Sequence, residues 1–454
     1  MALLLAAALA VLPLSGCGEV KQTNEGLTIY ASAETINYWN RVLNGYRYAY
    51  PDVAVDLVDL SDLTEREFSE RLASELMSGK GPDLFIVGEE FMKLRDVYKL
   101  MDSGAFADIT EEIASHPELG SGSGEGISKR YNQTVMEQGV WNEKRYLMPI
   151  CYRFPILLTS QGILDESGFD VGQCGDFMGF VREAQSFVGS PKNEEQRRRL
   201  FGSGMAFANY SLWMGAPIFD YQNQTVNLSL PELQETASLY QSLYREEQEG
   251  PFEANKLFTR WINDGNRGRV FENYEDAHRL FPGAASYVEA HGEMVAFPLR
   301  GMDGKIHAMV DQAFAVNANS PNVHNASNFI RIALEKYQYD GMIPCFPVQN
   351  AYVPDLWTVF RESNRSISFY LEFQYVDDNG DYQLLEGRMG SLAAISPEFI
   401  DEYTGWTQEL GDASFYTPEQ EKLYELMTPY YKGEADYETC IKKAQEQLTL
   451  YMTE

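Results

Sequence analysis

The sequence is poor in the residues that hold metals and disulfides. Its 454 residues include only five cysteines and five histidines, and no HExxH motif occurs. Cys151, Cys174, Cys345 and Cys440 are widely spaced and form no CxxC pair, which argues against a zinc site. These four residues form either two disulfides or four buried thiols. We therefore predict neither a metal site nor a cofactor.

Positive charge is also scarce. Lysine and arginine total 36 against 67 aspartates and glutamates, so the formal net charge is −31. A surface of this sign repels phosphate backbones, and nucleic-acid binding is not expected. Hydrophobic residues make up 44% of the chain, which is enough for a packed globular protein of two domains or one large bilobed unit.

Only one long apolar run occurs, at the N-terminus. Residues 1–14 are almost wholly apolar. This run is shorter than a transmembrane helix needs and is typical of the hydrophobic core of a signal peptide. It leads into Leu14-Ser15-Gly16-Cys17, which resembles the lipobox of bacterial lipoproteins. We therefore predict a signal peptide over residues 1–16, a lipid on Cys17, a polar tether over residues 17–26, and anchorage to the outer face of the cytoplasmic membrane. The alternative is a plain apolar segment with a chance cysteine.

The next segments alternate between strand and helix patterns. Apolar, β-forming runs at 27–31, 53–57 and 84–87 predict three strands. An apolar stripe from Ile36 to Tyr46 predicts the first intervening helix, and the capping box from Thr64 to Glu67 starts the second. This order predicts βαβ units and an α/β fold.

Further along, the apolar run from 148 to 158 is interrupted by Pro149 and Pro155, which suits a crossing between domains. The glycine-rich stretch 120–126 lacks the preceding strand and following lysine of a phosphate-binding loop, so we interpret it as a linker. Two more helices are predicted from the stripes Ala326, Phe329, Ile330, Ala333, Tyr337 and Tyr437, Ile441, Ala444, Leu448, Tyr451.

Several short motifs, taken in order, resemble family 1 extracellular solute-binding proteins, the group that contains maltose-binding protein. The most recognisable is GKGPDLF at 79–85, which leads into the third strand. The others are YPDV at 50–53, GAFADIT at 104–110, FPLRGMDG at 297–304 and AVNANSP at 315–321. The resemblance covers residues 27–454, although 355–415 departs from the smaller members.

This resemblance implies a two-lobed periplasmic-binding-protein fold of type II, with ligand held in a cleft between two α/β lobes. It places one lobe at 27–149 and 304–343 and the other at 150–303 and 344–454. The chain is then expected to cross between lobes near Pro149, Gly304 and Pro344. It also implies a carbohydrate ligand, an ABC permease and its ATPase as partners, and a monomer.

Candidate ligand-binding residues follow from strand ends and from the resemblance. Glu34 follows the first strand and Glu89 and Glu90 follow the third, where α/β sheets meet their ligands. Carboxylates there accept hydrogen bonds from sugar hydroxyls, unless they are simply solvated loop charges. The resemblance adds Arg153 near the first crossing and Asp311 near the return crossing. Arg153 forms either a ligand contact or an interlobe salt bridge.

Two aromatic residues complete the set. Trp213 occupies a place that resembles the family's stacking platform for sugars, and its alternative role is core packing. Tyr274 follows a strand-like segment at another place that faces the cleft in the family.

Two other functions remain open. An exported hydrolase such as a glycosidase needs two carboxylates about 5–10 Å apart. The sequence shows no nucleophile elbow and no paired-acid signature. A surface lipoprotein that binds a partner protein is the second alternative. The βαβ order and the crossing motifs favour a ligand cleft in a protein that is not an enzyme.

Overall fold

The structure is a computed structural model that describes residues 26–116, 119–120, 127–191, 199–201, 210–249, 269–274, 294–336, 346–352, 370–376, 382–388 and 397–453. The predicted signal peptide, Cys17 and most of the tether lie outside these residues, as do Pro344 and Cys345.

The described strands are β1 (Gly26–Ala31), β2 (Ala54–Asp59), β3 (Leu84–Val87), β4 (Val140–Trp141), β5 (Lys144–Arg145), β6 (Leu147–Arg153), β7 (Ile156–Ser160), β8 (Arg199–Phe201), β9 (Phe219–Asp220), β10 (Thr225–Val226), β11 (Arg269–Tyr274), β12 (Met294–Pro298), β13 (Ile306–Val316), β14 (Phe346–Pro347), β15 (Tyr370–Val376), β16 (Tyr382–Arg388) and β17 (Leu410–Phe415). The described helices are α1 (Ile36–Ala49), α2 (Glu65–Met77), α3 (Glu89–Leu94), α4 (Val97–Asp102), α5 (Thr110–Ser115), α6 (Gln133–Met136), α7 (Gln161–Ser167), α8 (Phe177–Val188), α10 (Tyr210–Trp213), α11 (Pro231–Glu249), α14 (Val323–Lys336), α17 (Pro397–Trp406), α18 (Pro418–Tyr431) and α19 (Tyr437–Thr453).

A seven-stranded sheet forms the centre of the first lobe. Its order is β14-β6-β13-β3-β1-β2, with β17 also paired to β13. Strands β1, β2 and β3 are mutually parallel, as the βαβ pattern predicts, whereas β13 runs antiparallel to both β3 and β6. The carboxyl ends of β1, β3 and β6 therefore open on the same edge of the sheet.

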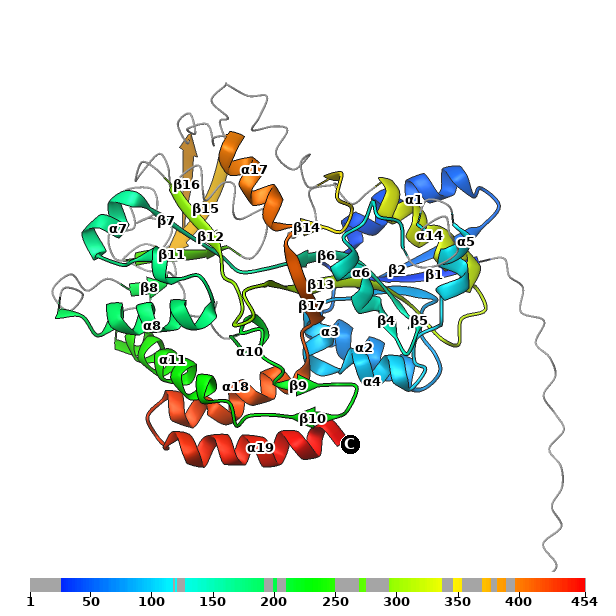
Figure 1. Cartoon of the computed structure of the whole chain (residues 1–454). Helices are drawn as coiled ribbons and strands as arrows, with labels where there is room; N and C mark the ends of the chain where they lie inside the picture. Colours follow the sequence, from blue (N-terminus) through cyan, green and yellow to red (C-terminus); the bar gives the residue numbers. More distant parts are fainter. Residues whose placement is uncertain are drawn as a thin grey trace, which may run out of the picture.

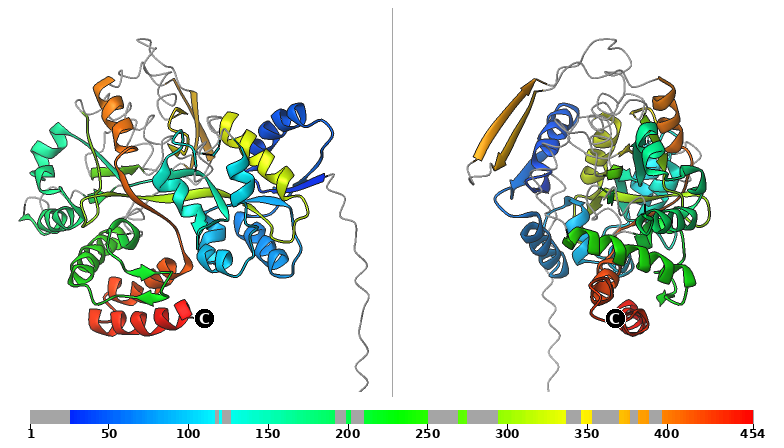
Figure 2. Two further views of the ribbon diagram at one scale, coloured as in Figure 1. Left: turned by 45° about the vertical axis from the view of Figure 1, so that its right-hand side comes forward. Right: turned by 90° about the vertical axis from the view of Figure 1, so that its left-hand side faces the viewer.

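The second lobe has its own four-stranded sheet, ordered β12-β7-β11-β8. Helices α7, α8 and α11 lie around it, and α18 and α19 lie below α11 (Figure 1). Strands β6 and β13 run between this lobe and the first, and the same division is visible in the turned views (Figure 2). The predicted α/β, two-lobed fold is confirmed.

The chain passes from one sheet to the other between β6 and β7 and again between β12 and β13. Pro149 lies within β6, opposite Ala313, and the first passage comes at Phe154–Pro155, between β6 and β7. Pro155 holds Phe154 extended, which suits a straight passage. The second passage lies between β12 and β13 and includes Gly304, which has a positive φ of 76°.

Two later strands return to the first sheet. Phe346 in β14 lies opposite Tyr152, and β17 pairs in parallel with β13, although the predicted boundaries assign both strands to the second lobe. The exact division of the chain between the lobes stays a prediction.

Local sequence signals explain the first helices. Helix α1 buries Trp39, Leu43 and Tyr46 of its predicted stripe. At the start of α2 the Thr64 hydroxyl accepts the Glu67 N–H, and the Glu67 carboxylate accepts the Thr64 N–H at 3.0 Å. This is the predicted capping box, which satisfies two backbone donors that the helix leaves free.

Helix α19 differs from its predicted stripe. It buries Cys440, Ala444, Leu448 and Met452, a strict four-residue spacing, whereas Tyr451 is 39% exposed. In α14 the stripe residues from Ala326 to Ala333 are buried as predicted, and Tyr337 lies outside the described residues.

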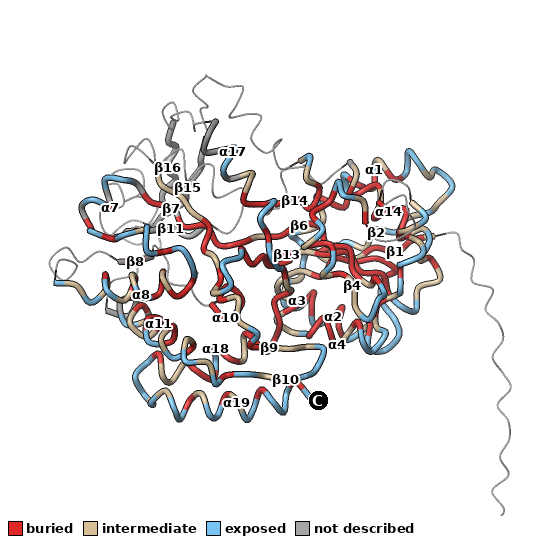
Figure 3. The backbone as a smooth tube through the Cα atoms, in the orientation of Figure 1, coloured by how far each residue is buried: buried red, intermediate tan, exposed pale blue. Residues whose placement is uncertain are grey.

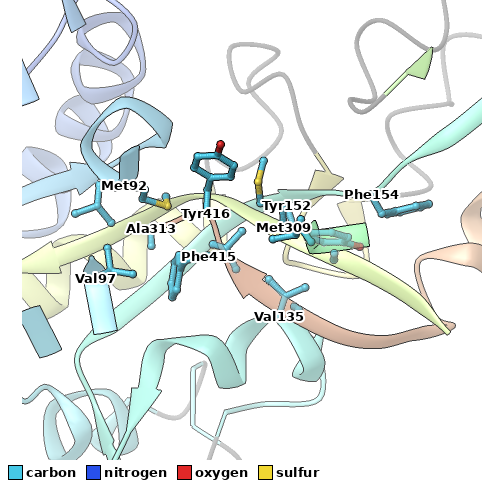
Figure 4. Packing of buried hydrophobic residues seen from close by; sticks show 14 of the residues in the cluster. Met92, Val97, Val135, Tyr152, Phe154, Met309, Ala313, Phe415 and Tyr416 are labelled. Atoms are coloured by element: carbon cyan, nitrogen blue, oxygen red, sulfur yellow. The ribbon is translucent and has the colours of Figure 1, made fainter. Parts of the chain in front are cut away.

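The buried core follows strands β6 and β13 through the middle of the molecule (Figure 3). Figure 4 shows Tyr152, Met309, Ala313 and Phe415 gathered where β6, β13 and β17 meet. Of the four internal cysteines, Cys151, Cys174 and Cys440 are buried free thiols. Within the described part of the chain, no helix is long and apolar enough to cross a membrane.

Candidate ligand-binding site

A cavity of about 500 Å³ opens at the carboxyl edge of the seven-stranded sheet. Its described lining comes from β1, α2, β3, α3, β6, β13 and the segment between β1 and α1. This is the edge at which open α/β sheets bind ligands. The lining residues are Tyr30, Ser32, Glu34, Thr35, Glu65, Phe68, Ser69, Ile86, Gly88, Glu89, Glu90, Phe91, Arg153, Asp311 and Gln312.

Arg153 is the cation in this lining, at the carboxyl end of β6. Its Nη2 donates to a Glu89 carboxylate oxygen, and its Nε lies 3.2 Å from the Asp311 carboxylate. Asp311 lies on β13, and Glu89 lies at the start of α3, the helix that follows β3. The ion pairs therefore link the end of β6 to β13, its neighbour in the sheet, and to the helix that follows β3. Whether Arg153 serves as a ligand contact or as an interlobe bridge stays a prediction.

A β-bulge directs Asp311 into the cavity. Val310 and Gln312 lie opposite Tyr152 and Cys151, which are consecutive in β6, so Asp311 is the additional residue on β13. Bulges of this kind re-aim a side chain away from the regular alternation of a strand. This explains how a carboxylate enters a buried apolar strand and still reaches Arg153.

Lys93 neutralises the other side of the acidic lining. Its Nζ lies 2.8 Å from carboxylate oxygens of both Glu89 and Glu90, one helical turn away on α3. Burial would raise the pKa of Glu89, but Arg153 and Lys93 outweigh burial and hold that pKa below its ordinary value. Burial likewise disfavours the Lys93 ammonium, but its hydrogen bonds to Glu89 and Glu90 raise its pKa.

Glu34 has the opposite electrostatic environment. Desolvation raises the pKa of Glu34, and the negative charges of Glu65 and Asp311 raise it further. Its backbone N–H donates to the Glu65 carboxylate at 3.2 Å. The lining thus contains five carboxylates facing Arg153 and Lys93, and its net charge is negative.

Aromatic side chains supply the apolar part of the cavity. Tyr30 is held by a hydrogen bond from its hydroxyl to Glu75 and by the Arg71 guanidinium, which lies 5.5 Å from its ring centroid. Phe68 and Phe91 are buried beside it in the lining. The sequence-based prediction missed Tyr30, although its place near the end of the first strand is the same signal that selected Glu34.

Five of the seven predicted ligand-binding residues therefore line one cavity: Glu34, Glu89, Glu90, Arg153 and Asp311. Their contact with a ligand stays a prediction. Tyr274 ends β11 in the second sheet, where its backbone lies opposite Ile156.

Trp213 does not line this cavity. It is the last residue of α10, its side chain is 1% exposed, and it belongs to the hydrophobic core. Its indole N–H has no hydrogen-bond partner among the described residues. The structure places Trp213 as its core alternative predicts, and a stacking role stays a prediction that would require this packing to open.

No group of three or more histidine, cysteine, aspartate or glutamate side chains in the described ranges is arranged to hold a metal ion.

No model of a known protein family matches the chain, and no curated protein sequence matches it. Solved structures, however, are similar to it. The sugar-binding protein MalE from Xanthomonas citri is similar over 94% of this chain and 97% of its own, at 12% identity and a TM-score of 0.64.

Two further structures have the same architecture. An ABC transporter solute-binding protein from Thermotoga lettingae, bound with α-D-tagatose, matches at 14% identity and a TM-score of 0.56, over 94% of this chain and all of the other. An ABC substrate-binding protein from Listeria monocytogenes in complex with cycloalternan matches at 12% identity and a TM-score of 0.57, over 94% and 99%. The fold is that of a periplasmic binding protein. At these identities the likeness concerns the fold alone.

Proposed function

We propose that this protein is an extracellular solute-binding protein that captures a sugar or oligosaccharide and delivers it to an ABC importer. The observation that carries the proposal is the polar cavity at the carboxyl edge of β1, β3 and β6, where Glu34, Arg153 and Asp311 converge. Its volume lies within the range of about 300–1,000 Å³ that is typical of small-molecule sites.

The chemistry of the lining suits a polyhydroxylated ligand. Carboxylates such as Glu34 and Glu90 accept hydrogen bonds from hydroxyl groups, and Arg153 donates them. Tyr30 adds an aromatic ring of the kind that packs on the C–H face of a sugar. We expect residues of the second lobe to cover the bound ligand when the lobes close.

The names of the similar structures support the transport role, since they include sugar-binding and ABC solute-binding proteins. Together with the N-terminal apolar run and Cys17, they support export, lipid anchorage to the membrane and an ABC permease as partner. On this proposal the protein is a monomeric binder without a cofactor and does not transform its ligand.

A carbohydrate hydrolase is the second candidate, and one observation favours it. The surroundings of Glu34 raise its pKa, whereas Arg153 and Lys93 lower the pKa of Glu89. Two carboxyl groups with opposite shifts are the usual requirement of an acid and a base in glycoside hydrolysis. Recovery of an oligosaccharide unchanged after prolonged incubation with the protein separates the binder from this enzyme.

A thermal-shift screen of the protein against monosaccharides, oligosaccharides, amino acids and peptides tests the proposal. A sugar at a hundred times its dissociation constant stabilises the folded protein by about 2.7 kcal/mol. Glu90→Gln should reduce that shift, whereas Glu70→Gln, on the exposed face of α2, should leave it unchanged. Stabilisation by amino acids or peptides alone would overturn the carbohydrate assignment.

A further inference from the structure

Two buried carboxyl groups, Asp96 and Glu419, interact with each other where α18 approaches α3, outside the residues that line the cavity. The Asp96 side chain caps the N-terminus of α4, the helix that follows α3 in the chain. Glu419 lies in the first turn of α18, which packs on α11 and α19 of the second lobe. Figure 1 shows α18 beginning close to α3, and residues of the two helices are in contact.

Glu419 is completely buried, with 0% exposure, and Asp96 is 7% exposed. Neither carboxylate oxygen of Glu419 has a hydrogen-bond partner among the described residues. Asp96, in contrast, accepts the backbone N–H of Tyr98 at 2.8 Å and that of Lys99 at 3.4 Å. An ionised carboxylate without donors is costly to bury, so Glu419 is the member of the pair that takes up a proton.

The other groups around Glu419 do not neutralise it. The charge of Lys99 favours the ionised form of Glu419, but the Lys99 ammonium donates its hydrogen bond to the Tyr451 carbonyl oxygen on α19. The Tyr221 hydroxyl is hydrogen-bonded with the Thr417 hydroxyl. Arg95 and Lys422 act on Tyr451, whose pKa is raised by burial and by the charges of Glu419 and Asp96.

Burial raises the pKa of Glu419 to about 7, and the Asp96 charge adds to this effect. The Glu419 backbone N–H, the Thr417 hydroxyl and Lys99 act in the opposite direction and are outweighed. Burial also raises the pKa of Asp96, against the two backbone N–H groups that it caps.

We propose that Asp96 and Glu419 hold one proton between them, and that loss of this proton loosens the contact of α18 with the segment formed by α3 and the start of α4. The protonated pair joins the lobes through a neutral carboxyl and a carboxylate. Deprotonation places two negative charges in a buried contact with too few donors, and the repulsion separates the helices.

The position of the pair relates it to the cavity. Glu89 and Glu90 start α3, and Asp96 follows two residues after that helix ends. Tyr416 lies three residues before Glu419. Burial raises the pKa of Tyr416, and Glu421, Glu89 and Glu90 raise it further, so the charges of the cavity acids act on this part of the chain. A displacement of α18 against α3 therefore moves the helix that carries Glu89 and Glu90 into the cavity lining.

The sign of the pH effect follows from the raised pKa. The folded protein binds the proton more tightly than the unfolded chain, whose glutamate has an ordinary pKa of about 4.3. The stability that the proton contributes is fully present below that value and is lost as the pH rises to about 7. Above that pH the loss is complete and stays constant.

Glu419→Gln tests the proposal, because glutamine keeps the shape and cannot ionise. At pH 5 the melting temperatures of this variant and the wild type should be similar, and at pH 8 the variant should melt several degrees higher. Glu425→Gln is the matched control, since Glu425 is an exposed carboxylate on the same helix, paired with Lys422. Its difference from the wild type should be the same at both pH values.

Two direct measurements complete the test. Infrared spectroscopy at pH 6 should show the carbonyl band of a protonated carboxylic acid that Glu419→Gln removes. Hydrogen exchange in the first turn of α18, corrected for intrinsic rates, should accelerate between pH 5 and pH 8 in the wild type and not in Glu419→Gln. The shared proton would be excluded by either of two results: a difference in melting temperature between Glu419→Gln and the wild type that is the same at all pH values, or a carbonyl band that remains in Glu419→Gln. Unchanged protection of α18 would overturn the loosening.

Discussion

The Arg153 guanidinium and the Asp311 carboxylate lie 3.2 Å apart because a bulge in β13 turns Asp311 toward the end of β6. Both side chains are mostly buried, and Arg153 also binds Glu89. This three-residue arrangement fixes the edge of the sheet and forms the polar floor of the cavity.

Arg153→Met should therefore destabilise the protein by about 2–3 kcal/mol. The substitution removes the cation beside the buried Asp311 carboxylate, and an uncompensated buried charge is costly, whereas Glu89 keeps its ion pair with Lys93. Denaturant unfolding measures the change in free energy. Arg182→Met is the control, because the Arg182–Glu235 pair is exposed and should contribute less than about 1 kcal/mol. Equal effects of the two substitutions would show that the Arg153 pairs are solvated.

Trp213→Ala should lower the free energy of unfolding by about 3–5 kcal/mol, because it leaves a large cavity in the core. Tyr48→Ala, at a side chain that is 91% exposed, should change it by less than about 0.5 kcal/mol. Thermal and denaturant unfolding measure both changes. If Trp213→Ala keeps its stability and loses sugar binding, the side chain stacks on the ligand and the core assignment is wrong.

The negative lining should discriminate against acidic sugars. A uronic acid should bind about tenfold more weakly than the matching neutral sugar, because its carboxylate faces Glu34, Glu65 and Asp311. Glu34→Gln should reduce this ratio, and Glu70→Gln should not. Titration calorimetry with matched pairs of sugars from the thermal-shift screen gives the ratios. A uronic acid that binds more tightly would mean that Arg153 leaves its partners to meet the ligand.

Metabolic labelling with a fatty acid tests the membrane anchor. The wild-type protein should incorporate the label and Cys17→Ala should not, since the thiol of Cys17 is the predicted attachment site. Cys440→Ala, at a buried thiol, is the control and should keep the label. Equal labelling of the wild type and Cys17→Ala would exclude this site.

Sequence patterns predicted correctly those elements whose structure depends on residues close by in the chain. The apolar runs of β1 and β3, the stripe of α1 and the Thr64–Glu67 capping box depend on neighbours within one or two helical turns, and all were predicted. The position of Glu34 and Glu89 at one sheet edge follows from the parallel order of the strands.

Other features depend on distant residues and could not be predicted. The bulge at Asp311 depends on the pairing of β13 with β6, and no pattern in the sequence around Asp311 predicts it. The buried face of α19 is set by its packing on α18, which favours Cys440 and Met452 over Tyr451. Glu419 is a charged residue in the first turn of a helix, and only the tertiary contact with Asp96 buries it.

The pairing of Val87 with Ala313 has a consequence for the order in which the chain can fold. Strand β3 has no partner on one side until β13, more than two hundred residues later, has been synthesised. Closing so long a loop is slow, because the chain loses conformational entropy before the contacts between β3 and β13 form and stabilise it. Nascent chains shorter than about 316 residues should therefore keep an open sheet edge, a state that favours threading through a membrane pore and recognition by chaperones.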